Sequence, residues 1–334
     1  MSDMQMKYAG ILGMGFYVPE KVLTNYDLEK MVETSHDWIV DRTGIKERHI
    51  AAPEQATSDQ ALIAARKALE DAGIEAEQLD CIIVATETPD TKFPSTACVL
   101  QDLLGAKAAA AFDLSAGCSG FVYSLSVANS MITSGLYKHI LIVGAETLSR
   151  IMNWKDRNTC VLFGDGAGAA VVGEVPEGYG ILSVEMGADG SGGKFLQMPA
   201  GGSRKPASHE TVDNNEHYIF MDGSEVFKFA VKIMASASKK VMDKAGISIE
   251  EVDLIIPHQA NTRIISASAK RLHVPEEKVF VNVDRYGNTS AASVPIALCE
   301  ARQQGLVKKD GKIVLVGFGA GLTWAAVAMK WWSK

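Results

Sequence analysis

The chain has 334 residues, 47% hydrophobic and 22% charged, and this balance is typical of a globular protein of about two domains or one large α/β unit. Its net charge of −7 argues against general nucleic-acid binding, so an anionic ligand would need a local basic patch. No apolar run approaches the roughly 20 residues of a membrane helix, and the first residues lack the pattern of a signal peptide. Five cysteines without a C-x-x-C pair favour a reducing cytoplasm over a disulfide framework or a zinc site.

The first half of the sequence alternates apolar strands with amphipathic helices. Asn25 and Ser35 are suitable N-caps for short helices, and Gly73 is a suitable C-cap for a longer one. We expect strands at 8–18, 80–86, 108–114, 139–144 and 167–175. We expect helices at 26–32, from 35 through 42, and at 58–72, 94–104 and 121–132.

The second half repeats this alternation after a polar interruption. Residues 187–216 are rich in Gly, Ser, Asp and Asn, which predicts a long surface flap or an insertion between halves. Beyond it we expect helices at 224–245, 262–272 and 290–304, and strands at 252–257, 279–283 and 312–317. Apolar strands that alternate with helices predict a buried, mostly parallel α/β sheet.

Three pairs of segments recur in the same order, which indicates an internal duplication. The pairs are 72–83 with 245–256, Gly117-Cys118 with Gly287-Asn288, and Gly164–Gly168 with Gly317–Gly321. Short sequences of this kind are also common in the turns of α/β proteins, but here the order and the spacing of the segments also agree between the two halves. We therefore expect two related halves, 1–178 and 179–334, whose equivalent strand ends face one another across a pseudo-twofold axis.

The run from Phe112 to Gly120 passes from a predicted strand to a predicted helix and places Cys118 at the turn. Unpaired backbone N–H groups and the positive end of a helix dipole favour the thiolate there. The plain alternative is a buried structural cysteine. The duplication would bring Asn288 to a matching helix start, and His258 directly follows the strand at 252–257.

A cysteine, a histidine and an amide in one pocket predict acyl transfer. A thiolate attacks a carbonyl carbon, and N–H groups at Cys118 and in the 317–321 loop would hold the oxyanion. Because the amide of Asn288 does not relay protons, it is better suited to join His258 as a second donor site for a carbonyl or enolate oxygen. Two oxygen sites suit a reaction between two carbonyl compounds.

Four sequence motifs together resemble those of β-ketoacyl-acyl carrier protein synthase III, and the resemblance covers essentially the whole chain. The motifs are 113-DLSAGCSG-120, 257-PHQAN-261, 286-YGNTSAAS-293 and 317-GFGAGLTW-324. The resemblance implies a duplicated thiolase-like fold with a five-layer α-β-α-β-α core, a homodimer and a cytoplasmic enzyme. It also implies the reaction that initiates fatty acid biosynthesis.

In the reaction implied by this resemblance, an acyl-CoA primer acylates Cys118, and malonyl-acyl carrier protein then loses CO₂ and attacks the thioester. His258 and Asn288 would stabilise the enolate, and the N–H groups of Cys118 and Ala320 would form the oxyanion hole. Ala320 stands where many relatives carry glycine, a change that retains the backbone donor. The resemblance implies no cofactor or metal, because the CoA thioesters are substrates.

The resemblance also assigns binding residues, each of which has an ordinary structural alternative. Trp38 would stack on adenine beside Arg42 and Arg157, and Asn261 would contact the pantetheine. Phe93 would enter the acyl pocket of a partner subunit. The acidic carrier protein would meet a basic cluster made of Arg263, Lys270, Arg271, Lys228 and Lys232. Without the resemblance these would be packing aromatics and solvated charges.

Three other functions remain alternatives. One is another thiolase-fold enzyme, such as a 3-ketoacyl thiolase or a hydroxymethylglutaryl-CoA synthase. A degradative thiolase uses a second cysteine as its base. Cys299 is poorly suited to that role, because it lies in the apolar pattern of a helix. A papain-type hydrolase lacks support from the motifs. A non-catalytic CoA-binding scaffold would form no thioester. The sequence does not fix the primer, because methylene differences are worth only about 1–3 kcal/mol.

Overall fold

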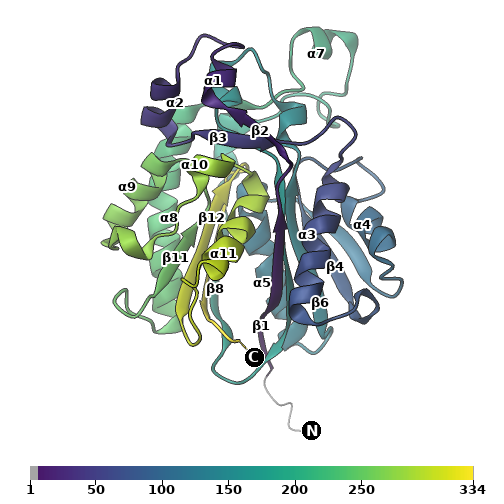
Figure 1. The fold of residues 1–334 in the computed structure, drawn as a ribbon, viewed down its shortest axis with the longest axis vertical. Helices are drawn as coiled ribbons and strands as arrows, with labels where there is room; N and C mark the ends of the chain where they lie inside the picture. The colour runs from purple at the N-terminus through teal and green to yellow at the C-terminus, as the bar shows by residue number, and fades with distance from the viewer. Residues whose placement is uncertain (1–6, 334) are drawn as a thin grey trace.

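Two β-sheets form the centre of the molecule in a computed structural model that describes residues 7–333 (Figure 1). The first sheet has the order β1 (Tyr8–Tyr17), β7 (Gly166–Val175), β6 (His139–Glu146), β4 (Cys81–Ala85) and β5 (Ala110–Leu114). The second sheet has the order β8 (Gly180–Ala188), β13 (Thr323–Lys330), β12 (Lys312–Gly319) and β11 (Leu254–Pro257). The two sheets therefore repeat one arrangement of strands.

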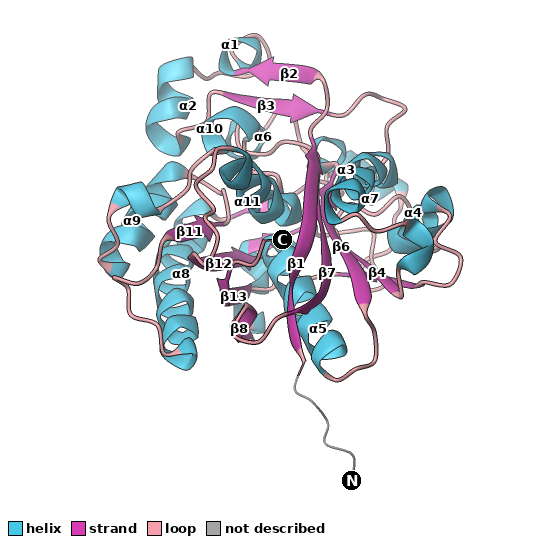
Figure 2. Cartoon of the chain, turned by 60° about the horizontal axis from the view of Figure 1, so that its bottom comes forward, coloured by secondary structure: helices cyan, strands magenta, loops and turns pink. Residues whose placement is uncertain are grey.

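Helices cover both sheets and fill the space between them, so the core has five layers (Figures 1 and 2). The outer face of the first sheet carries α3 (Thr57–Ala72) and α4 (Thr96–Leu104), whose alanines and leucines pack on the strands. The central layer consists of α5 (Gly120–Thr133) and α11 (Ser293–Gln303). The outer face of the second sheet carries α8 (Gly223–Ala245) and α9 (Thr262–Leu272).

The strand positions refine the predicted duplication. Cys81 and Leu254 begin equivalent strands 173 residues apart, and His139 and Lys312 begin the next pair at the same separation. The match of Gly164–Gly168 with Gly317–Gly321 is wrong, because the first motif leads into β7 whereas the second ends β12. Only a three-residue turn joins β12 to β13, but the connection from β6 to β7 is longer and holds η3 (Leu148–Ile151) and α6 (Arg157–Cys160).

Both sheets are mixed, so the prediction of a mostly parallel sheet is wrong. β1 and β6 run antiparallel to β7, and β12 and β8 run antiparallel to β13. Parallel pairs join β4 to β5 and β6, and β11 to β12. The strands β8 and β13, which pair with each other in antiparallel orientation, are not among the predicted strands. In place of the predicted strand at 279–283, the structure has a single β-bridge between Val279 and Ile255, because α10 (Val283–Tyr286) already begins at Val283.

Two of the three predicted caps are confirmed. The Ser35 hydroxyl accepts from the Trp38 N–H at 3.1 Å and begins α2 (His36–Thr43), and Gly73 ends α3 with φ of 65°. The N-cap of α1 (Asn25–Leu28) is Thr24 instead of Asn25. The buried Asn25 side chain instead bonds to the Ile45 carbonyl and the buried Arg48 guanidinium.

Above the sheets, in the view of Figure 1, a small cap consists of α1, α2 and a two-stranded antiparallel sheet of β2 (Lys21–Thr24) and β3 (Glu47–Ile50). The predicted polar segment holds η4 (Gly190–Phe195), β9 (Leu196–Gln197) and α7 (His209–Asp213), and β9 pairs with β10 (Phe220–Met221). Further short turns are η1 (Ala76–Gln78), η2 (Gly117–Ser119), η5 (Glu276–Lys278) and η6 (Ser290–Ala292).

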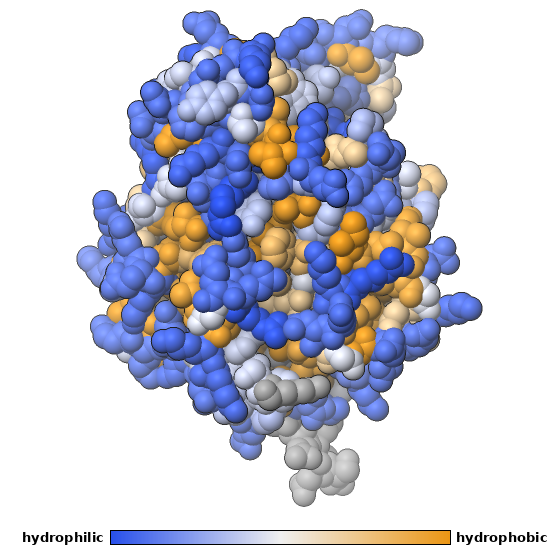
Figure 3. Space-filling view, viewed as in Figure 1, coloured by the Kyte–Doolittle hydropathy of each residue, from blue (hydrophilic) through white to orange (hydrophobic). Residues whose placement is uncertain are grey.

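On the face shown in Figure 3, apolar side chains gather across the middle between hydrophilic ones, whereas the cap is mainly hydrophilic. Within residues 7–333, no helix has the length and apolar character needed to cross a membrane. All five cysteines are free thiols, and only Cys98 is exposed.

Candidate active site

Cys118, His258 and Asn288 line one cavity of about 640 Å³, although they come from distant parts of the chain. Cys118 lies in η2, in the connection between β5 and α5, which confirms its predicted place between a strand and a helix. His258 directly follows β11, and Asn288 lies between α10 and η6. The three side chains are only 8%, 1% and 7% exposed, so a substrate here would be largely withdrawn from water.

Two glycines allow the cysteine turn and the loop after β12 to touch. Gly117 has φ of 54°, and a Cβ there would lie 2.6 Å from the Ala320 nitrogen. A Cβ on Gly319 would lie 2.3 Å from the Cys118 nitrogen. The Thr323 hydroxyl ties the same turn together, at 2.8 Å from the Ala116 carbonyl oxygen and 3.0 Å from that of Ala320. The N–H groups expected to form the oxyanion hole therefore belong to two backbone segments in direct contact.

The electrostatics of Cys118 differ from the sequence prediction. Burial raises the pKa of its thiol to about 12, although hydrogen bonds from Ser290 and the backbone act in the opposite direction. The nearby carboxyl groups of Glu146 and Glu87 raise this pKa further. The prediction that the turn favours a thiolate is wrong for the unliganded protein, because desolvation outweighs the favourable backbone dipoles.

His258 is held as a neutral imidazole. Burial lowers its pKa to about 3, and its ring lies edge-on to Phe318 with 5.3 Å between centroids. Its Nδ1 lies 2.6 Å from the Ser293 hydroxyl oxygen, and its backbone N–H donates to the Val316 carbonyl at 2.7 Å. The remaining ring nitrogen, Nε2, is available to the cavity that the residue lines.

Backbone bonds fix Asn288 on both sides. Its N–H donates to the Leu162 carbonyl at 2.8 Å, and its own carbonyl accepts from the Gly164 N–H at 3.0 Å. Its Oδ1 accepts from the Ser290 N–H at 2.9 Å. Because the oxygen is occupied, the side-chain NH₂ group is left to donate to a ligand. His258 and Asn288 thus provide a pair of neutral donors.

The mouth of the cavity carries the residues predicted to bind CoA. Trp38 and Arg42 line it, and the Arg42 guanidinium lies 4.8 Å from the Trp38 ring centroid. Arg157 lies 5.0 Å from the same ring but does not line the cavity. Asn261 lines the wall, where its Nδ2 donates to the Arg42 carbonyl at 2.9 Å and its Oδ1 caps α9.

The predicted basic cluster lies on two helices that pack together, α8 and α9. All five of its side chains are exposed, but only Arg263 and Lys228 also line the cavity. Lys228 is paired with Glu225 at 2.6 Å, and that hydrogen bond raises the pKa of the lysine. Arg263, which lines the cavity, lies 5.8 Å from the centroid of the Phe227 ring.

A smaller cavity of about 150 Å³ adjoins Cys118 on the side of Ala320. Its other lining residues are mainly apolar: Leu148, Ile151, Phe163, Leu196, Met198 and Ile219. Phe93 does not line this cavity in the single chain, and its side chain is 86% exposed on the loop before α4. The structure thus places Phe93 at the surface and separate from the cavity beside Cys118 of its own chain.

Sequence reasoning missed two acidic residues beside the nucleophile. Glu87 accepts from the Gly117 N–H at 2.7 Å and from the Ser115 hydroxyl at 2.9 Å, so it holds the cysteine turn. Burial and the charge of Glu87 raise the pKa of Glu146, which is 0% exposed, to about 7. A lone glutamate after a strand carries no recognisable motif, so only the fold reveals these contacts.

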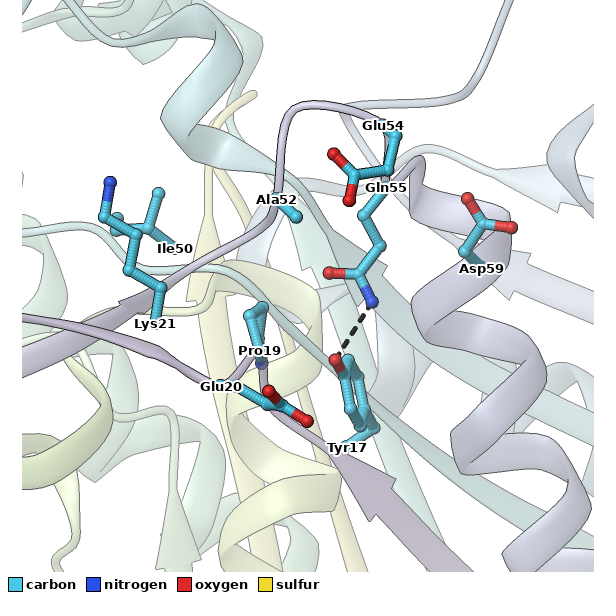
Figure 4. Close-up of a pocket in the computed structure, with 9 residues that line it drawn as sticks. All are labelled: Tyr17, Pro19, Glu20, Lys21, Ile50, Ala52, Glu54, Gln55 and Asp59. Carbon is cyan, nitrogen blue, oxygen red and sulfur yellow. Dashed lines mark hydrogen bonds between the residues drawn. The ribbon is translucent and has the colours of Figure 1, made fainter.

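A more open hollow of about 790 Å³ lies beside the two-stranded sheet of β2 and β3 (Figure 4). It is lined by Glu20, Glu54, Asp59 and neighbouring residues, and a hydrogen bond of 2.9 Å joins Gln55 to the Tyr17 hydroxyl. It contains no cysteine or histidine. Within residues 7–333, no group of three or more His, Cys, Asp or Glu side chains is arranged to hold a metal ion.

A duplicated five-layer fold that brings a thiol, an imidazole and a carboxamide to one cavity is the arrangement of thiolase-like acyltransferases. Two family models match the chain: 3-oxoacyl-[acyl-carrier-protein] synthase III over residues 112–190, and the C-terminal region of the same family over residues 242–331. The chain belongs to the 3-oxoacyl-[acyl-carrier-protein] synthase III family, which is also called β-ketoacyl-[acyl-carrier-protein] synthase III.

Relatives agree with this assignment over nearly the full length. A β-ketoacyl-[acyl-carrier-protein] synthase III from Caldanaerobacter subterraneus is 64% identical, covering 97% of this chain and 98% of that protein. The homologue from Clostridioides difficile is 55% identical over 97% of this chain and 98% of its own. The crystal structure of the synthase from Aquifex aeolicus has a TM-score of 0.90 at 50% identity, covering 97% and 100% of the two chains.

Proposed function

We propose that this protein is an acyltransferase that condenses an acyl-CoA primer with malonyl-acyl carrier protein and so initiates fatty acid biosynthesis. The family membership of the chain and the names of its relatives support this proposal. The structural observation that carries the proposal is that Cys118 faces His258 and Asn288 in one cavity, whose mouth holds Trp38 and Arg42.

In the first half-reaction, Cys118 Sγ attacks the thioester carbon of the acyl-CoA. The N–H groups of Cys118 and Ala320 hold the developing oxyanion. CoA then departs as the free thiol, which carries away the proton that the cysteine lost. Trp38 stacks on the adenine, Arg42 and Arg157 pair with phosphates, and Asn261 contacts the pantetheine. The apolar cavity beside Cys118 receives the acyl chain.

In the second half-reaction, malonyl-acyl carrier protein enters the same cavity. Its carbon–carboxylate bond breaks, CO₂ leaves, and the electron pair forms an enolate. His258 and Asn288 donate hydrogen bonds to the enolate oxygen. The carbanion attacks the acyl thioester, the bond between the acyl carbon and Cys118 Sγ breaks as the 3-ketoacyl-acyl carrier protein forms, and the released thiolate takes up a proton from water. Both donors are neutral, so they stabilise the enolate without protonating the carbon.

Incubation with acetyl-CoA and malonyl-acyl carrier protein tests this function. We expect an acetyl adduct on Cys118 by mass spectrometry with acetyl-CoA alone, and CO₂ with 3-ketobutyryl-acyl carrier protein when both substrates are present. An adduct without use of malonyl-acyl carrier protein would indicate a different thiolase-fold enzyme. The absence of an adduct with acetyl-CoA and with longer straight and branched acyl-CoA primers would contradict the proposed acyl transfer and favour a CoA-binding scaffold.

We also propose that the basic cluster docks the carrier protein, with Arg263 as its central residue. Replacing Arg263 by Glu places a negative charge at the entrance, so we expect the KM for malonyl-acyl carrier protein to rise about tenfold or more. Acylation by acetyl-CoA should stay within about twofold of the wild-type rate. Arg66→Glu on α3 is a matched charge reversal away from the cavity. An unchanged KM in Arg263→Glu would contradict the docking role.

We further propose a cytoplasmic homodimer that needs no cofactor or metal, because CoA thioesters supply the chemistry as substrates. Among the described residues, β5 has a strand partner only on its β4 side, and the nearby Phe93 is exposed. Pairing of two β5 edges would bring the partner subunit's Phe93 toward the acyl cavity. The repeated strand order supports a boundary between the two halves near residue 178.

A further inference from the structure

The buried hydroxyl of Ser293 makes a short contact with the candidate enolate-binding histidine. Ser293 is the first residue of α11, is 2% exposed, and places its Oγ 2.6 Å from Nδ1 of His258. The same Oγ accepts from the backbone N–H of Gln259 at 3.3 Å. Ser293 therefore contacts two consecutive residues of the strand end that carries the imidazole.

The direction of the His258–Ser293 hydrogen bond follows from the hydrogens that are available. A serine hydroxyl has a single hydrogen, and its oxygen already accepts from Gln259. Within residues 7–333, Nδ1 of His258 is the acceptor that this hydrogen can reach. If Nδ1 carried a proton instead, the buried serine hydrogen would be left without an acceptor, which is unfavourable. The hydroxyl therefore donates, and Nδ1 accepts.

This arrangement determines which ring nitrogen carries the hydrogen. A neutral imidazole that accepts at Nδ1 carries its hydrogen on Nε2. Burial keeps the ring neutral, and burial is the only cause of its lowered pKa, because no charged group contributes. A carboxylate at the position of Ser293 would have the opposite effect, since it would draw a proton to Nδ1 and favour imidazolium.

Gln259 reinforces the placement of the serine acceptor. Its side-chain Nε2 donates to the Pro257 and Phe280 carbonyls at 2.9 and 3.1 Å, and its Oε1 accepts from the Asn282 N–H at 2.9 Å. These bonds fix the backbone directly after His258, so its N–H stays directed at Ser293. The serine oxygen is thus kept in its accepting role.

We propose that Ser293 is a positioning residue that holds His258 in the neutral tautomer with its hydrogen on Nε2, directed at the enolate oxygen. This inference rests on the proposed function, because it assigns the means by which one donor of the enolate site is prepared. It predicts that removing the hydroxyl impairs decarboxylation of malonyl-acyl carrier protein but leaves acylation of Cys118 intact.

Nitrogen-15 NMR of the histidine side chains tests the tautomer without relying on activity. The His258 signals are assigned with His258→Gln. In the wild type at neutral pH we expect a protonated Nε2 and an unprotonated Nδ1. In Ser293→Ala the two nitrogen shifts should move toward each other, because neither tautomer is then enforced. Ser293→Thr keeps the hydroxyl and should restore the wild-type shifts.

Kinetics provide the second readout. We expect Ser293→Ala to lower kcat for decarboxylation about tenfold, with little change in KM and with acetyl transfer to Cys118 within about twofold. Ser268→Ala removes another buried hydroxyl, one that bonds to the Ile264 carbonyl, and should change neither rate. Unchanged His258 shifts in Ser293→Ala, or equal losses in both half-reactions, would overturn the proposal. An inactive wild type with the expected shifts would instead contradict the proposed function alone.

Discussion

Individual residues show how burial changes the chemistry that a motif suggests. The turn at Cys118 has the small residues and backbone donors expected from its sequence, but the thiol pKa is raised to about 12 because the group is withdrawn from water. The nucleophile therefore rests as a thiol. We propose that the thiol loses its proton only as the acyl-CoA is attacked, with the N–H groups of Cys118 and Ala320 as the proposed oxyanion donors.

This resting state predicts the pH dependence of Cys118 alkylation. Because the thiol pKa is raised, the thiolate is scarce at neutral pH and its fraction grows as pH increases toward about 12. Inactivation of the free enzyme by iodoacetamide should therefore accelerate about tenfold per pH unit between about pH 7 and about pH 9. Cys118→Ser is the control for alkylation elsewhere. A rate that levels off near neutral pH would show that the thiolate is already formed.

At the scale of elements, the regular alternation of strands and helices was predictable, but the antiparallel strands β8 and β13 of the second sheet were not. The stripe of apolar residues in 58–72 and the Gly73 cap specify α3 directly, and α3 spans Thr57–Ala72. By contrast, only a three-residue turn separates β13 from β12, and the glycines at 317, 319 and 321 give this stretch the sequence pattern of a loop. The proposed roles of the site residues come from the motifs and the family resemblance, whereas the contacts of Ser293, Glu87 and Thr323 depend on packing between distant segments.

The exposed edge of β5 yields a prediction about assembly. The Ala110 N–H bonds to the Asp80 carbonyl at 2.9 Å, so the alternation of a parallel strand turns the Ala111 N–H toward the open edge. Ala111→Pro removes that donor without touching the pairing with β4. We expect sedimentation analysis to show a shift from dimer to monomer.

The matched control for this experiment is Ala111→Ser, which retains the N–H and should stay dimeric. Circular dichroism would establish that the proline variant is folded. A folded Ala111→Pro protein that remains dimeric at the wild-type concentration would show that β5 edges do not form the interface.

For the whole molecule, the buried carboxyl of Glu146 links stability to pH. Its pKa of about 7 lies above the ordinary value of 4.5, so the native protein binds a proton that the unfolded chain has released between these values. The free energy of unfolding therefore falls as pH rises through this window. Relative to that of Glu146→Gln, the free energy of unfolding of the wild type should fall by up to about 3 kcal/mol between pH 4.5 and pH 7.

Urea unfolding at several pH values measures this difference, and subtraction of the Glu146→Gln curve removes the contributions of other titrating groups. A difference that stays constant with pH would contradict the raised pKa of Glu146. A difference that grows in favour of the wild type at higher pH would mean that its ionised form is the one stabilised by the fold.

We propose that the two halves have different tasks, because the candidate nucleophile Cys118 comes from one half and the candidate enolate donors His258 and Asn288 come from the other. Rates of the two half-reactions in Cys118→Ser, His258→Ala and Asn288→Ala measure this division directly. We expect Cys118→Ser to lose acylation, while the other two variants keep acylation by acetyl-CoA and lose decarboxylation of malonyl-acyl carrier protein. Equal loss of both half-reactions in all three variants would contradict this division of tasks between the two halves.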